Sequence, residues 1–106
     1  MRWSILALIV ILSSCTLTGA ATTENQASVD ITSDTIVPIV IFIKPGTMVT
    51  WTNKDNEPHT VTILGQFDSG VLGRRHTFSH TFDKEGTFTY KDLFDTERIA
   101  KVVVKK

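Results

Sequence analysis

From residue 28 onward, apolar and polar residues alternate in short runs, which is the pattern of half-buried β-strands. The alternation predicts strands over 28–31, 36–43, 48–52, 59–64, 77–82, 88–90 and 99–104. Turn-forming residues separate these runs, most clearly at 44–47 and 83–86, and a glycine-containing loop is expected over 65–75. No run has a helical period. The sequence therefore predicts an all-β fold, a β-sandwich with Greek-key connections.

The amino-terminal segment has a different pattern. An unbroken apolar run, Ile5 to Leu12, follows the basic Arg2 and is too short to cross a bilayer core of ~30 Å as a helix. It predicts a secretory signal peptide over 1–14. Cys15, the only cysteine in the chain, comes directly after this segment in Leu-Ser-Ser-Cys. This resembles a bacterial or archaeal lipobox, which implies cleavage before Cys15 and attachment of lipid to it. The alternative is a free thiol in an ordinary signal peptide.

These features predict the organisation and location of the chain. Residues 15–27 are rich in Thr, Ala and Ser and are expected to form a lipid-anchored flexible stalk. One domain then remains, over 28–106. We expect an exported protein held at the outer face of the cytoplasmic membrane or, in a diderm bacterium, at the outer membrane. The membrane is then a partner through the lipid on Cys15.

Charge excludes one class of partner. The chain has 11 basic and 11 acidic residues, and removal of residues 1–14 takes away only Arg2, which leaves a net charge of −1. No basic run extends beyond Arg74-Arg75. Nothing in this balance favours a nucleic acid, which proteins bind mainly through clustered positive charge.

Five segments in order carry a resemblance to a known family. Residues 38–51 are similar to a P-x-x-I-x-V-x-x-G-T-x-V-x-W run, 53–61 to N-x-D-x-x-P-H-T-V, 67–72 to F-D-S-G-x-L, and 78–88 to F-S-x-T-F…G-T-Y. Residues 86–104 resemble a G-x-Y-x-Y strand, a copper loop of the form C-x-x-H-x-x-M and a final Val-rich strand. Together they resemble plastocyanin- and amicyanin-like cupredoxins, which are small blue copper proteins. The resemblance implies a Greek-key β-sandwich over about residues 28–106.

The same resemblance implies that the copper site is degenerate. His59 stands at the first ligand position, whereas Asp92, Asp95 and Arg98 stand where the family has Cys, His and Met. A blue copper site needs a thiolate, two imidazoles and a weak axial ligand. No cysteine follows residue 15. We therefore expect type 1 copper, and blue-copper electron transfer with it, to be absent.

Two interpretations of the altered site remain open. In one, His59, Asp92 and Asp95 bind a harder metal, as Cu(II) in a non-blue site, Zn(II), Mn(II) or Fe(II), since Asp92 shares the inward face of its strand with Tyr90. In the other, an ion cluster replaces the metal. A protonated His59 and Arg98 then balance the two carboxylates, and the planar guanidinium is suited to hold one of them. The charge balance favours the second interpretation, and we expect no cofactor.

The remaining candidate residues have structural interpretations first. His80 shares the inward face of its predicted strand with Phe78 and is expected at the edge of the core, with a ligand role as the alternative. His76 is expected on the surface, although its loop could bring it near His59. The hydroxyl of Thr60 follows the first ligand position and could fix the ligand loop, or it could be an ordinary strand residue.

Three classes of function follow. The first is a non-redox binding module that contacts a protein partner through the loops around His59 and 92–98. The second is a non-blue copper protein for storage, delivery or sensing. The third is a hydrolase built on His59 and Asp92, which we do not favour because no serine or cysteine nucleophile lies in a recognisable motif. The sequence therefore predicts a protein that is not an enzyme.

Overall fold

The computed structural model describes residues 25–106, so the predicted signal peptide and Cys15 lie outside the described residues. The structure contains nine strands: β1 (Gln26–Ile31), β2 (Ile36–Val37), β3 (Val40–Ile43), β4 (Thr47–Asn53), β5 (Thr62–Ile63), β6 (Phe67–Asp68), β7 (Thr77–Phe82), β8 (Gly86–Asp92) and β9 (Asp95–Val104). No helix in this part of the chain is long and apolar enough to cross a membrane. The all-β prediction is confirmed.

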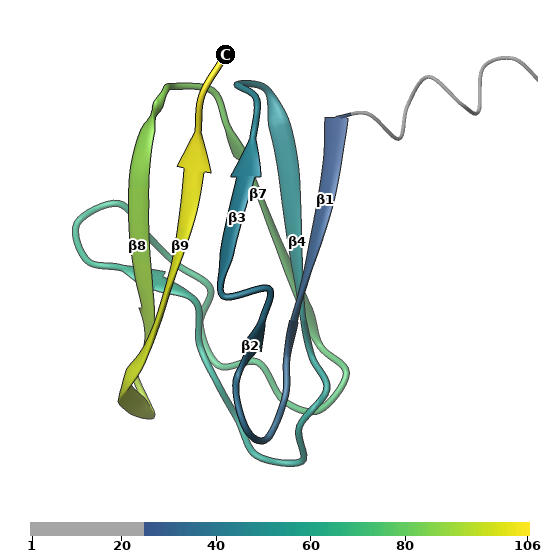
Figure 1. Ribbon diagram of the computed structural model, residues 1–106. Coiled ribbons are helices and arrows are strands. Elements are labelled where there is room, and N and C mark those ends of the chain that lie inside the picture. The colour runs from purple at the N-terminus through teal and green to yellow at the C-terminus, as the bar shows by residue number, and fades with distance from the viewer. Residues whose placement is uncertain (1–24) are drawn as a thin grey trace, which may run out of the picture.

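The strands form two sheets that lie face to face (Figure 1). One sheet has the order β2-β1-β4-β7 and the other β3-β9-β8-β5-β6. Most neighbours are antiparallel, but β1 is parallel to β4 and β3 is parallel to β9. In the second parallel pair, Val40 lies opposite Lys101, so β3, from the first half of the domain, pairs with the last strand.

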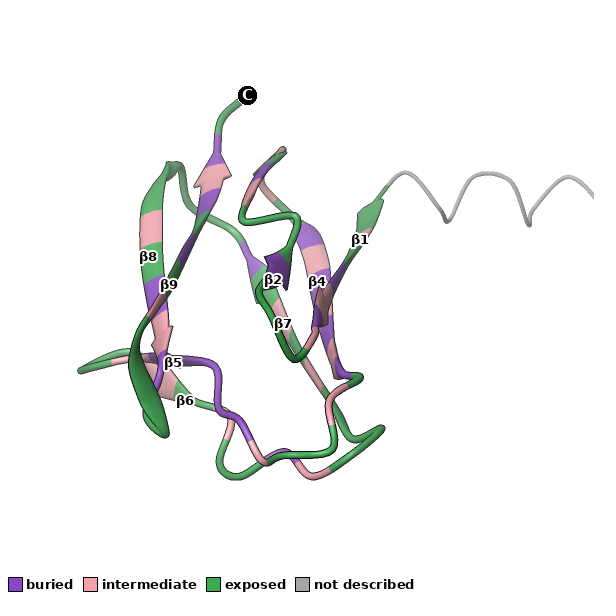
Figure 2. Ribbon diagram, turned by 60° about the horizontal axis from the view of Figure 1, so that its bottom comes forward, coloured by how far each residue is buried: buried purple, intermediate pink, exposed green. Residues whose placement is uncertain are grey.

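The core lies between the sheets and is centred on Trp51, which has no exposed surface. Side chains along β4 alternate between buried and half-buried, as the sequence pattern predicts, and Figure 2 shows this alternation along the strands. Tyr90 packs edge-on against Trp51 with the ring centroids 5.4 Å apart, and burial raises the pKa of Tyr90 to about 12. Phe78 and Phe82 complete the contacts, at 5.8 and 6.3 Å from Trp51. Each such aromatic pair contributes about 0.5–1.5 kcal/mol beyond simple burial.

The predicted strand over 36–43 is interrupted at Pro38. Ile36 and Val37 pair with β1 in one sheet, whereas Val40–Ile43 pairs with β9 in the other. Proline has no backbone N–H to continue a ladder. The chain therefore passes from one sheet to the other at this position.

The predicted strand over 59–64 is reduced to Thr62–Ile63, with one isolated bridge from His59 to Leu72. The reason is that side chains, rather than a neighbouring strand, accept hydrogen bonds from the backbone N–H groups between His59 and Thr62. The Thr60 N–H donates to Asp92 Oδ1 at 3.0 Å, and the Val61 N–H donates to Ser69 Oγ at 2.8 Å. No neighbouring strand is needed to satisfy these donors.

Other strands are longer than the alternation predicts. Only Leu93 and Phe94 separate β8 from β9, and Asp92 and Asp95 face each other across this turn. The loop over 65–75 contains the short strand β6, and β1 begins at Gln26, two residues before the predicted start. The turn between β8 and β9 marks one end of the sandwich, the hairpin end. The other end, where β1 begins and β9 finishes, is the amino-terminal end (Figure 1).

Candidate functional site

The candidate site lies at the hairpin end, where the last residue of β8 meets the segment between β4 and β5. The alternation along β8 buries Tyr90 and Asp92 on the same face. His59 comes from the other segment, and its backbone is fixed there by paired hydrogen bonds with Leu72, of 3.1 and 2.8 Å. Asp92 is 1% exposed and His59 is 5% exposed. An acidic group and an imidazole are therefore buried in contact.

His59 is held between two carboxylates. Its Nδ1 lies 2.5 Å from Asp92 Oδ2, and its Nε2 lies 2.7 Å from Asp55 Oδ2. We call Asp55, His59 and Asp92 the carboxylate–imidazole cluster. A neutral imidazole has one N–H donor, whereas an imidazolium has two. Only the imidazolium can donate to both carboxylates at once, and such charge-assisted hydrogen bonds are short and strong.

Asp92 uses its second oxygen to fix the backbone around the site. Oδ1 accepts the N–H groups of Thr60 and Phe94, both at 3.0 Å. Thr60 Oγ1 in turn accepts the Leu93 N–H at 2.9 Å, so the expected role of this hydroxyl in fixing the loop is confirmed. The carboxylate thus joins the turn between β8 and β9 to the His59 segment, with three donors directed at a single buried anion.

Asp55 was not among the residues that the sequence indicated. Its position depends on Asn53, which is fully buried at the end of β4. Asn53 Oδ1 accepts the Asp55 N–H at 2.8 Å, and its Nδ2 donates to the carbonyl oxygens of Glu57 and Leu72 at 2.9 and 2.8 Å. The hydrogen bond from His59 holds the pKa of Asp55 below its usual value, aided by backbone N–H donors. The available signal was the spacing of four residues between an acid and a histidine, after an asparagine that can form an Asx turn.

Asp95 and Arg98 lie apart from this cluster. The Asp95 side chain is 55% exposed, and its Oδ2 lies 3.8 Å from Arg98 Nε. The guanidinium donates to backbone carbonyls of the loop before β2, at 2.8 Å to Thr32 and also to Ser33. The structure therefore brings His59 and Asp92 together, whereas Arg98 braces a distant loop.

We expect Arg98→Met to lower the free energy of unfolding by about 1.5–3 kcal/mol, because charged hydrogen bonds to the carbonyls of Thr32 and Ser33 are lost. The His59 ring signals in NMR should not shift, since no Arg98 donor contacts His59 or Asp92. Chemical denaturation measures the first effect, and Arg98→Lys is the matched control for charge without the planar fork. A displaced His59 signal would contradict this separation.

The other two histidines have structural roles in the described part of the chain. His76 is exposed, and its Nδ1 accepts the Gly73 N–H at 3.1 Å. His80 is half-buried and packs between Phe67 and Phe82, with centroids 4.3 and 4.7 Å away. Its expected place at the edge of the core is confirmed.

The donor set at the hairpin end does not fit a blue copper ion. Residues 25–106 contain no cysteine, and both ring nitrogens of His59 contact carboxylates. Within the same residues, no group of three or more His, Cys, Asp or Glu side chains is arranged to hold a metal ion. The arrangement instead neutralises buried charge and cross-links three segments of backbone.

No protein-family profile matches the sequence, and no curated protein matches it. Solved structures do resemble it. A purple cupredoxin from Nitrosopumilus maritimus is 29% identical with a TM-score of 0.71, over 74% of this chain and 99% of that one. An amicyanin variant in the Cu(I) state is 26% identical with a TM-score of 0.72, over 76% of this chain and 82% of that one.

A copper-containing nitrite reductase from Thermus scotoductus has a TM-score of 0.71 at 20% identity, over 76% of this chain and 22% of that one, which shows the shared fold. The resemblance inferred from the five sequence segments agrees with these structures. The two-sheet architecture of this chain agrees with that resemblance. The chain is a cupredoxin-like protein.

Proposed function

We propose that this protein is an exported, non-redox binding module, attached to a membrane through lipid on Cys15, in which the carboxylate–imidazole cluster stands in place of a copper site. The observation that carries the proposal is the occupation of both His59 ring nitrogens by Asp92 and Asp55, at 2.5 and 2.7 Å. A metal would have to displace at least one of these charged contacts. It would also have to compete with the two backbone N–H groups that Asp92 already accepts.

The cluster serves binding by making the hairpin end rigid. A buried carboxylate without partners is costly, so the three donors to Asp92 hold the loops in one arrangement. Around it lie exposed apolar side chains: Leu93 is 44% exposed, Phe94 58% and Val71 64%. Val71 is next to Leu72, which bridges to His59. A rigid end with exposed apolar side chains is suited to a protein partner.

A catalytic role is not part of the proposal. His59 is 5% exposed and both of its nitrogens are engaged. Ser69, a nearby hydroxyl, accepts the Val61 N–H and donates to the Gly70 carbonyl. It is therefore committed to the backbone rather than to a base.

The second candidate is a non-blue copper or zinc protein. Asp92 and the His59 Nδ1 supply a carboxylate and an imidazole nitrogen, donors that suit Cu(II) or Zn(II), whereas Asp55 contacts Nε2 on the other side of the ring and could join the same ion only if its loop moved. Asp95 is turned to solvent and paired with Arg98, so it adds little to this set.

Metal binding separates the two candidates. We expect the protein purified without chelators to carry far less than one equivalent of metal. Added Cu(II) or Zn(II) should change its melting temperature by less than about 2 °C, because a ligand stabilises only a site that it can occupy. Elemental analysis and thermal melting measure both. A large metal-dependent rise that His59→Ala and Asp92→Ala each abolish would replace the binding-module proposal with the copper or zinc one.

The anchor is tested separately. Cys15→Ser should move the protein from the membrane fraction to the soluble fraction, because the modified thiol would be absent. Fractionation with immunodetection measures this, and Ser14→Ala is the matched control beside it. If Cys15→Ser remains with the membranes as the wild type does, lipid on Cys15 does not hold the protein there.

A further inference from the structure

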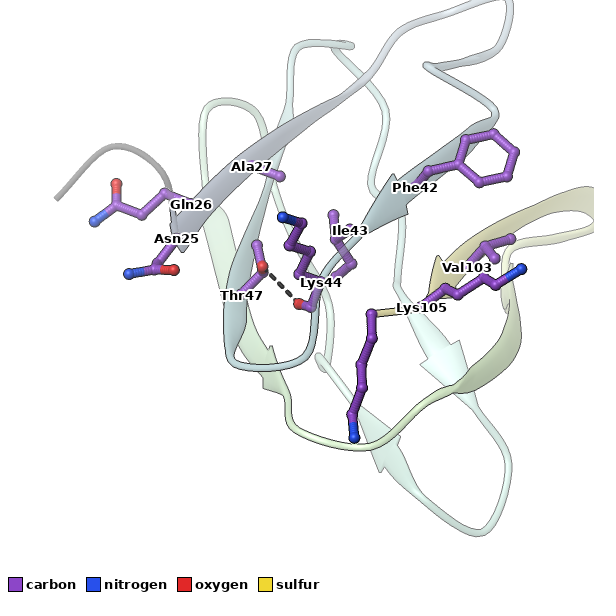
Figure 3. A pocket seen from close by; sticks show the side chains of 10 residues that line it. Asn25, Gln26, Ala27, Phe42, Ile43, Lys44, Thr47, Val103 and Lys105 are labelled. Carbon is purple, nitrogen blue, oxygen red and sulfur yellow. Dashed lines mark hydrogen bonds between the residues drawn. The ribbon is translucent and has the colours of Figure 1, made fainter. Parts of the chain in front are cut away.

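A basic groove lies at the amino-terminal end, opposite the carboxylate–imidazole cluster. It is open, has a volume of about 790 Å³, and lies between the beginning of β1 and the ends of β3 and β9. Figure 3 shows Lys44 and Lys105 at this groove together with Phe42, Gln26 and Asn25. Lys106 also lines it.

The charged side chains that line the groove are all basic. No acidic residue is among those that line it. Within residues 25–106, the ion pairs involve Lys54, His59 and Arg98, and none involves Lys44, Lys105 or Lys106. The turn between β7 and β8 adds Asp83 and Glu85 at the same end, but also Lys84. Among the described side chains at this end, basic residues therefore outnumber acidic ones, in a protein whose formal net charge is zero.

Phe42 gives the groove an apolar rim. It is 77% exposed on β3, an edge strand that pairs only with β9. The side chain contributes little to the core from this position. An exposed aromatic ring beside lysines is the combination found on surfaces that rest in the interfacial region of a bilayer.

The position of the groove in the chain identifies its occupant. Asn25, the first described residue, lines the groove, and Cys15 is ten residues earlier in the sequence. Ten residues span at most about 35 Å when fully extended. If Cys15 carries lipid, the groove is kept close to the membrane surface, where lysines interact with anionic head groups.

We propose that this groove docks on an anionic lipid bilayer, with Lys44, Lys105 and Lys106 against the head-group phosphates and Phe42 in the interfacial layer. The domain then stands with its hairpin end directed away from the membrane, where a partner can reach Leu93 and Phe94. The inference rests on the proposed anchoring through Cys15, and it does not depend on what His59 binds.

The test measures which lysines the membrane covers. The full chain is reconstituted into phosphatidylcholine vesicles, or into vesicles that also contain phosphatidylglycerol, and its amines are labelled with a membrane-impermeant reagent. Mass spectrometry gives the labelling rate of each lysine. In the anionic vesicles, we expect the labelling of Lys44, Lys105 and Lys106 to fall at least fivefold, and that of Lys54 at the hairpin end to stay unchanged. High salt should remove the protection, because it screens the attraction.

Single substitutions supply the controls. Lys105→Gln should weaken the protection of Lys44 and Lys106 by about fivefold, the effect of one lysine near an anionic surface. Lys91→Gln, which removes the same charge outside the groove, should leave it intact. Equal labelling of the groove lysines in both kinds of vesicle would overturn the proposal. Protection in neutral vesicles that grows with protein concentration would also overturn it, and would indicate a second copy of the chain as the occupant.

Failure of the anchor gives a different result. If the chain does not remain bound to neutral vesicles, it lacks the lipid tether. The labelling of Lys44, Lys105 and Lys106 after addition of the chain to anionic vesicles still tests whether the groove binds the membrane. Metal content, which tests the proposed function at His59, is unaffected by either outcome.

Discussion

Replacing Asp92 with alanine is expected to lower the free energy of unfolding by about 3–5 kcal/mol. The carboxylate is 1% exposed and accepts hydrogen bonds from the His59 ring and from the backbone N–H groups of Thr60 and Phe94. Its removal leaves three donors without an acceptor: the His59 ring and the N–H groups of Thr60 and Phe94. For a domain of this size, the melting temperature should fall by at least about 12 °C.

Two further variants define the origin of that loss. Asp92→Asn keeps an oxygen that can accept the backbone donors but removes the negative charge, so its melting temperature should lie between those of alanine and wild type. Asp95→Ala removes an exposed carboxylate three positions later and should change the free energy of unfolding by no more than about 0.5 kcal/mol. If Asp92→Ala and Asp95→Ala melt together, the buried cluster does not stabilise the fold.

Replacing Asp92 with cysteine should convert the site into a coloured copper site. The substitution places a thiolate beside the His59 ring, at a position where the present oxygen lies 2.5 Å from Nδ1. Cu(II) bound by thiolate and imidazole absorbs visible light intensely, whereas Asp55 contacts Nε2 on the other side of the ring and is not placed to bind the same ion. In a Cys15→Ser background the new thiol is the only one, so any band that appears on addition of Cu(II) belongs to residue 92.

The matched controls separate colour from adventitious copper. Cys15→Ser alone should stay colourless with Cu(II), because it has no thiol. Adding His59→Ala to the cysteine variant should abolish the band, since the imidazole ligand is lost. Absence of the band from the cysteine variant itself would show that the turn between β8 and β9 leaves no room for a metal, whatever ligands are present.

Local pattern predicts most of this fold, because alternation directly reports which face of a strand is buried. The strands around Trp51 and Tyr90 follow it closely. It fails where side chains replace a neighbouring strand. Thr60 and Val61 have strand-like sequence, yet their N–H groups are taken by Asp92 and Ser69, which lie elsewhere in the chain. Period-two reasoning cannot anticipate such long-range acceptors.

The site shows the same limit. The inward position of Asp92 follows from its phase with Tyr90, so its approach to His59 could be predicted. The family's ligand position and the charge balance together suggested Arg98 as a further member. Backbone carbonyls at Thr32 and Ser33, more than sixty residues earlier, bind the guanidinium instead. Neutral carbonyls leave no trace in a count of charges, which is why the sequence could not reveal this partner.

The parallel pairing of β3 with β9 sets a condition on when the domain can form. Val40 can pair with Lys101 only after β9 has been synthesised. Until then β3 has no neighbouring strand in the second sheet. The conformational entropy of the long intervening segment is lost before the contact between the two strands can stabilise the fold, which slows folding. The second sheet cannot be completed before β9 has been synthesised, so the chain remains incompletely folded throughout synthesis. If the protein is exported, as proposed above, slow closure of the second sheet would leave the polypeptide more time to cross the membrane before it folds.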